Sequence, residues 1–193
     1  MVVLLFGVAS ATQAGTYNKQ LNIGDAAPDW SGLVGTDAKK HSLADLKGKE
    51  VVVICFTCNT CPYAVDYEDR LIALAKKFAA EDARCALVAI NANKVKDDLL
   101  PAMQERAKSK GFNFPYLHDE SQQVAKSHGA TFTPEFVVLN KEHKVVYLGA
   151  MDDSPDGKKI TQRYVEDAVA ATLAGRLPDT KDCLLYTSDA ADE

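Results

Sequence analysis

Short continuous apolar runs alternate along this chain with longer segments that have helical spacing. The run VVVICF, residues 51–56, is β-branched and aromatic and ends at a turn, which is typical of a strand buried on both faces. Residues 62–80 place apolar side chains largely at helical spacing with charges between them, so we expect a helix packed on that strand. The segment ALVAI, residues 86–90, predicts a second buried strand.

The remaining segments continue this order of elements. DDLLPAMQERAKSKG predicts a helix that ends at Gly111. SQQVAKSHG predicts a short helix with Ser121 as its N-cap and Gly129 at its C-terminal end. Two strands around a polar turn within residues 131–150 predict an antiparallel hairpin, and a last helix is expected at about residues 160–174.

The order of these elements predicts an α/β fold with a central mixed sheet flanked by helices. Ahead of the first buried strand, Gly, Pro and Asp recur at short intervals, which predicts an N-terminal strand or hairpin, and SLADL then predicts a brief helical turn. No repeat, low-complexity segment or linker divides residues 20–178, so we expect one domain there.

The N-terminus resembles a secretory signal peptide. An apolar run extends from Val2 to Ala9, small residues follow, and a cleavage point fits after Ala14. The run is much shorter than the roughly 20 residues that a membrane-spanning helix needs. A hydrophobic first strand is the alternative, although the polar GTYNKQ that follows argues against it. We therefore expect residues 1–14 to be removed and the protein to be periplasmic or secreted, without stable insertion in a membrane.

The C-terminal segment CLLYTSDAADE, residues 183–193, can be back-translated into something that resembles a transposase-end sequencing adapter. On this interpretation these residues are not native, and an ordinary polar tail is the alternative. In either case no function is assigned to Cys183.

The charge balance argues against a nucleic-acid partner. The chain has 22 basic and 27 acidic residues, which gives a net charge of −5, and its basic residues form no cluster that could follow a phosphate backbone.

The stretch CNTCPY contains the candidate chemistry. It follows the first buried strand, and Pro62 suits the first turn of a helix, so Cys58 is expected just outside that helix and Cys61 at its start. A helix N-terminus favours a thiolate, and the two-residue spacing lets the two sulfurs reach bonding distance. We therefore predict a redox-active pair, with Cys58 as the attacking thiolate and Cys61 as the resolving thiol.

The other cysteines are expected in the core. Cys55 lies inside the first buried strand and Cys85 at the edge of the second. Cys55 and the CxxC pair together have the spacing of part of a ferredoxin ligand run, but a suitably spaced fourth cysteine is missing. We accordingly expect no metal and no other cofactor. The pair would instead exchange electrons with protein thiols or disulfides and need a redox partner to reset it.

From about residue 23 to residue 177 the chain resembles the peroxiredoxin-like redoxins of the thioredoxin superfamily. The matching segments are CNTCPY with the following helix, AINAN, GFNFPYLHDESQQVA, GATFTPEFVVLN and LGAMDDS. The resemblance implies a thioredoxin-like fold in which Thr133 and Pro134 form a cis-proline loop that faces the CxxC pair and contacts substrate. A trans proline in an edge strand is the alternative.

The same resemblance makes a peroxidase the less favoured activity. Peroxiredoxins carry their peroxidatic cysteine before a proline, which matches Cys61 and Pro62. They also need Thr or Ser three residues earlier and Pro further upstream, where this chain has Cys58 and Ile54. Dithiol–disulfide exchange is therefore the expected reaction.

A copper-binding thioredoxin-like module is the other alternative. Soft thiolates suit Cu(I), and a histidine could complete a site with Cys58 and Cys61. His118, after a predicted strand end, is the candidate histidine, although a loop histidine is more often only solvated.

Four polar residues near predicted strand ends are also candidates. Asn91 and Asn93 follow the second buried strand and either line the active-site edge or act as turn residues. Asp152 and Asp153, after the last strand, are expected to be loop or helix-capping residues.

Overall fold

The computed structural model describes residues 18–80 and 83–183. The expected signal peptide and residues 184–193 lie outside the described residues. Among the helices of the described residues, none combines the length and the apolar character needed to cross a membrane.

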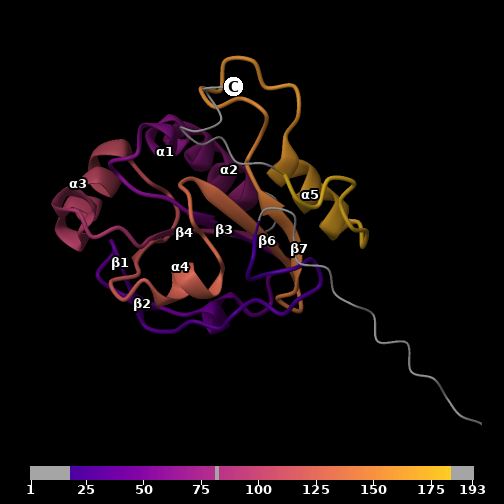
Figure 1. Cartoon of the computed structure of the whole chain (residues 1–193), viewed down its shortest axis with the longest axis horizontal. Coiled ribbons are helices and arrows are strands. Elements are labelled where there is room, and N and C mark those ends of the chain that lie inside the picture. Colours follow the sequence, from indigo (N-terminus) through magenta and orange to yellow (C-terminus); the bar gives the residue numbers. More distant parts are fainter. Residues whose placement is uncertain (1–17, 81–82, 184–193) are drawn as a thin grey trace, which may run out of the picture.

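In the described part of the chain, seven strands form one mixed sheet in the order β2-β1-β5-β4-β3-β6-β7 (Figure 1). The strands are β1 (Leu33–Gly35), β2 (Lys40–His41), β3 (Val51–Phe56), β4 (Cys85–Asn91), β5 (Tyr116–His118), β6 (Glu135–Asn140) and β7 (Val145–Gly149).

The central strand β3 is parallel to β4 and antiparallel to β6. All six of its side chains are buried, because alternate residues of a strand point to opposite faces and both faces of this sheet are covered. Cys55 belongs to the core on one face and Phe56 to the core on the other. The last residue of β3, Phe56, pairs with the first residue of β6, Glu135. The loops that precede β6 and follow β3 therefore leave the sheet side by side.

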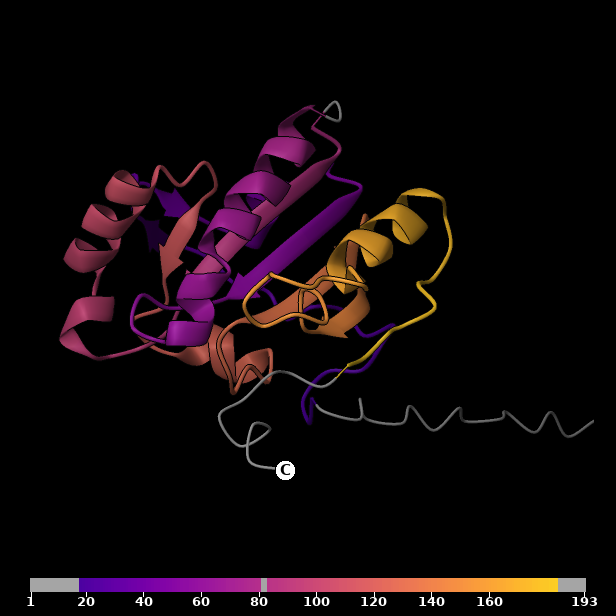
Figure 2. The same cartoon turned by 90° about the horizontal axis from the view of Figure 1, so that it is seen from above.

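Helices cover the sheet on both faces (Figure 2). Helices α2, α3 and α5 lie on one face, where Leu71, Met103 and Val165 join one core, whereas α4 and the N-terminal segment lie on the other, with Trp30 and Val124. The helices are α1 (Pro62–Asp66), α2 (Glu68–Ala80), α3 (Leu100–Lys110), α4 (Gln123–Ser127) and α5 (Tyr164–Leu173), with 3₁₀ turns η1 (Leu43–Leu46) and η2 (Lys96–Asp98).

The expected fold class is confirmed, including the N-terminal hairpin β1–β2, the helical turn at η1 and the hairpin β6–β7. Gly111 caps α3 in the left-handed conformation, with φ of 69°, as predicted.

Three helix boundaries differ from the sequence-based expectation. The helix predicted at residues 62–80 is interrupted at Tyr67, whose N–H bonds to the carbonyl of Ala64, three residues back. The N-cap of α4 is Gln122, not Ser121, although the Ser121 hydroxyl accepts the N–H of Gln123. Helix α5 begins four residues later than predicted, at Tyr164.

The late start of α5 has a local cause. The carboxylate of Asp153 accepts the N–H groups of Thr161 and Gln162, at 2.8 and 3.0 Å, and it also accepts the hydroxyl of Thr161. These bonds hold residues 161 and 162 in a loop. Asp153 is therefore the loop residue that was expected.

Candidate active site

The ends of β3 and β6 bring the two predicted halves of the site together. Cys61 is the N-cap residue of α1, and Pro62 occupies the first turn of that helix, where a missing N–H costs nothing. The Thr133–Pro134 peptide bond directly before β6 is cis, as the sequence resemblance implied.

Thr133 contacts both sulfurs of the CxxC pair. Its hydroxyl oxygen lies 3.3 Å from the Sγ of Cys58, and its carbonyl oxygen accepts the thiol of Cys61 at 3.3 Å. Contact with a single residue places the two thiols within the same small region.

The environment of Cys58 does not fit the attacking role that we expected for it. The residue is only 3% exposed, and burial raises the pKa of its thiol. Hydrogen bonds from the Thr133 hydroxyl and from the backbone N–H groups of Cys61 and Thr60 act in the opposite direction, while the nearby carboxylate of Asp98 adds to the increase. Cys61 is the partly exposed member of the pair, so solvent and substrates reach its sulfur more easily.

The dipeptide between the two cysteines is tied to the loop after β4. The N–H of Asn59 and the hydroxyl of Thr60 donate to the two carboxylate oxygens of Asp98, at 2.5 and 2.6 Å. The Asn59 amide donates to the carbonyl of Asp97 at 2.7 Å and accepts the hydroxyl of Tyr116 at 3.0 Å. Side chains from η2 and β5 thus fix the loop that carries the cysteines.

Asn91 and Asn93 lie behind this loop and donate hydrogen bonds to the same carboxylate, that of Asp98. The amide of Asn91, which is fully buried, donates to an Asp98 carboxylate oxygen at 3.2 Å and to the Tyr116 hydroxyl at 3.0 Å. Asn93 donates to the other Asp98 oxygen at 3.1 Å. Both amide groups are therefore part of the network around Asp98.

Sequence reasoning missed Asp98 and Tyr116. One signal for Asp98 was available: it follows the two asparagines at the end of a buried strand. Its immediate neighbours, however, are those of an ordinary helix start.

The other three cysteines lie outside the CxxC loop. Cys55 and Cys85 are buried in the core, as predicted, and burial raises the pKa of Cys55 well above its ordinary value. Cys183 contacts the hydroxyl of Tyr147 and the N–H of Ala150. All five cysteines lie among the described residues, and no disulfide joins any two of them.

A copper site receives no support from the geometry. Among the described residues, no group of three or more His, Cys, Asp or Glu side chains is arranged to hold a metal ion. His118 is instead a residue of β5, where it pairs with Val34 of β1 and Asn91 of β4.

The buried carboxyl group of Glu135 supports the cis-proline loop from behind. It accepts the backbone N–H groups of Thr131 at 3.1 Å and, more weakly, Phe132 at 3.5 Å. The residue is 4% exposed, and burial raises its pKa to about 7. Its carboxyl group therefore holds the segment that leads into Thr133.

A groove of about 300 Å³ runs beside this loop. Phe56, Thr57, Phe132 and Thr133 form its wall next to the cysteines, and Lys126 adds a positive charge. Phe132 is 48% exposed. The groove offers room for a side chain of a bound polypeptide.

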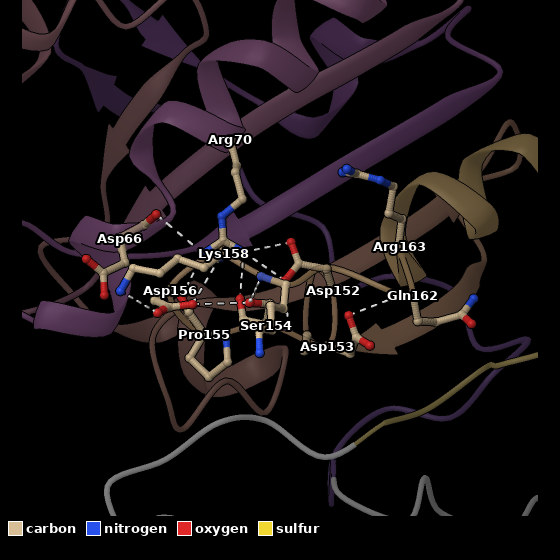
Figure 3. A network of polar contacts seen from close by, with 12 residues as sticks. Asp66, Arg70, Asp152, Asp153, Ser154, Pro155, Asp156, Lys158, Gln162 and Arg163 are labelled. Carbon is tan, nitrogen blue, oxygen red and sulfur yellow. Dashed lines mark hydrogen bonds and ion pairs between the residues drawn. The ribbon is translucent and has the colours of Figure 1, made fainter.

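Arg70 joins α2 to the loop after β7. Its guanidinium group donates two bonds to Asp152, both at 2.7 Å, and one each to the carbonyls of Ser154 and Pro155, at 2.9 and 2.7 Å (Figure 3). The guanidinium carbon also lies 3.5 Å from the ring centre of Tyr67. Asp152 thus lies in the loop after β7, as expected, and is in addition the buried ion-pair partner of Arg70.

Comparisons with known proteins bear on the family and the fold. A family model described as Redoxin matches residues 22–167. No curated protein matches the sequence significantly. A solved structure of a hypothetical protein from Sinorhizobium meliloti 1021 is 32% identical, with a TM-score of 0.79, and the match covers 86% of this chain and 93% of that one.

Two further solved structures extend the comparison. An uncharacterized conserved protein from Geobacillus kaustophilus is 31% identical with a TM-score of 0.79, over 89% of this chain and 93% of its own. A thiol:disulfide interchange protein of the thioredoxin family from Chlorobium tepidum TLS is 23% identical with a TM-score of 0.57, over 68% and 89%. The thioredoxin-like fold that the sequence implied is confirmed.

Proposed function

Because the chain belongs to the redoxin family, we propose that it is a thiol–disulfide oxidoreductase that exchanges electrons through Cys58 and Cys61. The observation that carries the proposal is the contact of both sulfurs with Thr133, on a cis-proline loop beside a helix start. Similarity to a thiol:disulfide interchange protein supports the same reaction class.

The exposure of the two thiols supports the following assignment of their roles. The Cys61 thiolate attacks a disulfide of the target protein, forms a mixed disulfide and releases one target thiolate. The Cys58 thiolate then attacks the Cys61 sulfur, so that the second target thiolate leaves and a Cys58–Cys61 disulfide forms. Two electrons pass to the target, and a dithiol partner must reduce the pair again. The order is the reverse of the one expected from sequence, because Cys58 is the buried thiol.

The substrate segment would lie along the cis-proline loop. We assign Thr133 and Pro134 to substrate binding, since the backbone before a cis-proline can pair with an extended segment. The adjoining groove, with Phe132 exposed at its rim, has room for a neighbouring apolar side chain of the target.

Single serine variants test this proposal. Cys61→Ser is expected to abolish reduction of insulin disulfides, whereas Cys58→Ser is expected to accumulate a mixed disulfide through Cys61 that mass spectrometry detects. Cys85→Ala, a buried cysteine outside the pair, is the control and should retain activity. Activity at the wild-type rate in Cys61→Ser would refute the proposal.

A peroxidase acting through Cys61 is the second candidate, because Cys61 is partly exposed and precedes Pro62 at the helix start. Peroxide consumption that depends on Cys61 and continues in Cys58→Ser would favour it. An absence of peroxide consumption would favour dithiol exchange.

We further propose that residues 20–178 act as one domain after export, on the basis of the apolar run at residues 2–9. The mass of the protein recovered from a secreting host would show loss of residues 1–14. Retention of an intact N-terminus in the cytoplasm would contradict export.

A further inference from the structure

The carboxylate of Asp98 receives four hydrogen bonds in a fully buried site. Two come from the dipeptide inside the CxxC motif, from Asn59 and Thr60, at 2.5 and 2.6 Å. The other two come from the amides of Asn91 and Asn93, at 3.2 and 3.1 Å. All four donors are uncharged groups. The two bonds from the dipeptide between the cysteines are the shorter ones, and hydrogen bonds to an ionised acceptor are stronger than those between neutral groups.

The donors come from two separate parts of the fold. Asn59 and Thr60 belong to the loop between β3 and α1, whereas Asn91 ends β4 and Asn93 follows it. Asp98 itself ends the turn η2. Because β4 is a central strand, its two asparagines fix the carboxylate relative to the sheet, and the carboxylate in turn fixes the loop.

The charge of Asp98 also acts on the buried thiol. Cys58 directly precedes Asn59, and the carboxylate is near enough to disfavour a negative charge on the Cys58 sulfur. The Tyr116 hydroxyl bonds to Asn59, and burial raises its pKa. The charge of Asp98 adds to that increase. A buried charge acts strongly because water does not screen it.

We propose that Asp98 is a positioning residue that fixes the dipeptide between the two cysteines and keeps the CxxC pair reducing. This inference rests on the proposed function of the pair. It specifies the direction in which electrons tend to flow: from the dithiol to the target protein.

Two effects of Asp98 act in the same direction. A fixed loop keeps the Cys58 sulfur close to Cys61 and raises the effective concentration of one thiol at the other, which favours the disulfide. A nearby negative charge disfavours the thiolate of the reduced pair, which again favours the disulfide. A pair whose disulfide is favoured is the stronger reductant.

The test is the equilibrium of the pair with glutathione, in which the dithiol and oxidised glutathione give the disulfide and two molecules of reduced glutathione. Asp98→Asn is expected to lower this equilibrium constant at least tenfold, which corresponds to a reduction potential about 30 mV higher. Its thiolate absorbance should also titrate at lower pH than in the wild type, a change that a purely structural role would not produce.

Two further variants separate the causes. Asp97→Asn is the matched control, because Asp97 is exposed and only its backbone carbonyl binds the loop. Thr60→Val removes one of the four bonds and leaves the charge in place, so a smaller change in the glutathione equilibrium is expected, in the same direction. Should Asp98→Asn fail to fold, this second variant carries the test, and an unchanged equilibrium would then overturn the inference.

The outcomes distinguish this inference from the proposed function. A wild-type pair that cycles with glutathione, together with an Asp98→Asn equilibrium within twofold of the Asp97→Asn value, overturns the role of Asp98 alone. A wild-type pair that forms no disulfide in oxidised glutathione overturns both.

Discussion

The hydroxyl oxygen of Thr133 lies 3.3 Å from the sulfur of Cys58, although 74 residues separate the two positions in the sequence and neither residue lies in a helix or strand. The hydroxyl can donate to a thiolate on Cys58, and this hydrogen bond lowers the pKa of a thiol that burial raises. The contact therefore favours formation of the attacking species in the second step of the exchange.

Thr133→Val should slow that second step. The substitution keeps the shape of the side chain and removes the donor, and a hydrogen bond worth about 1.4 kcal/mol corresponds to a rate about tenfold lower. Rapid quenching and mass spectrometry would follow the lifetime of the mixed disulfide. Thr131→Val is the control, because Thr131 is exposed and contributes its backbone N–H to Glu135. Equal lifetimes in the two variants would contradict the role of the hydroxyl.

Alkylation of the reduced, folded protein should be selective. Iodoacetamide is expected to modify Cys61 well before Cys55, Cys58 and Cys85, because Cys61 is partly exposed, as Cys183 is, whereas these three are buried. Peptide mapping at successive times gives the order of modification. Faster labelling of Cys58 than of Cys61 would restore the opposite assignment of roles.

Glu135 should make the protein less stable as the pH rises. Its pKa is about 7 in the folded protein, against 4.5 as the ordinary value, so the folded state binds more protons than the unfolded state between these two pH values. Stability therefore falls from about pH 4.5 to pH 7 and stays lower above that range. The full effect is limited to about 3 kcal/mol.

Glu135→Gln tests this dependence. The amide oxygen of Gln can accept the same two N–H groups without a charge, so the variant should be more stable than the wild type at pH 8 and similar to it at pH 4. Urea unfolding at both pH values measures the difference. The buried His128, whose pKa is lowered by burial, is present in both proteins and cancels in the comparison. A difference that does not change with pH would contradict the prediction.

Loss of the Asp152 charge should destabilise the fold. Asp152→Asn leaves the guanidinium of Arg70, which is 15% exposed, without its counter-charge, at an expected cost of about 3 kcal/mol. Glu142→Gln, which breaks the exposed pair with Lys141, is the control and should have no measurable effect. Thermal unfolding compares the two variants. Equal midpoints would show that the Arg70 network does not stabilise the loop after β7.

The sequence predicted the sheet and its cysteine loop because both depend on strong local patterns. A continuous β-branched run identified β3, and the sequence CxxCP identified a helix start directly after it. These signals need no knowledge of distant contacts. The cis bond before Pro134 followed from resemblance to a family and not from any local pattern.

The roles of the two thiols could not be predicted in the same way. The burial of Cys58 depends on Thr133 and on the packing of loops far apart in the sequence. The network around Asp98 was also hidden, because an aspartate among charged residues at a helix start looks like a solvated side chain. The hydrogen bonds of the Asn91 amide to Asp98 and Tyr116 become visible only in the folded structure.

The pairing of Phe56 with Glu135 restricts which insertions and deletions this sequence could accept during evolution. Deletion of one residue within β3 would shift the cysteine loop along its neighbour by about 3.3 Å and exchange the two faces of the strand. Thr133 and both thiols would all still be encoded, yet they would no longer meet. The number of residues from Val51 to Cys61 is therefore as important to the proposed chemistry as the identity of the cysteines themselves.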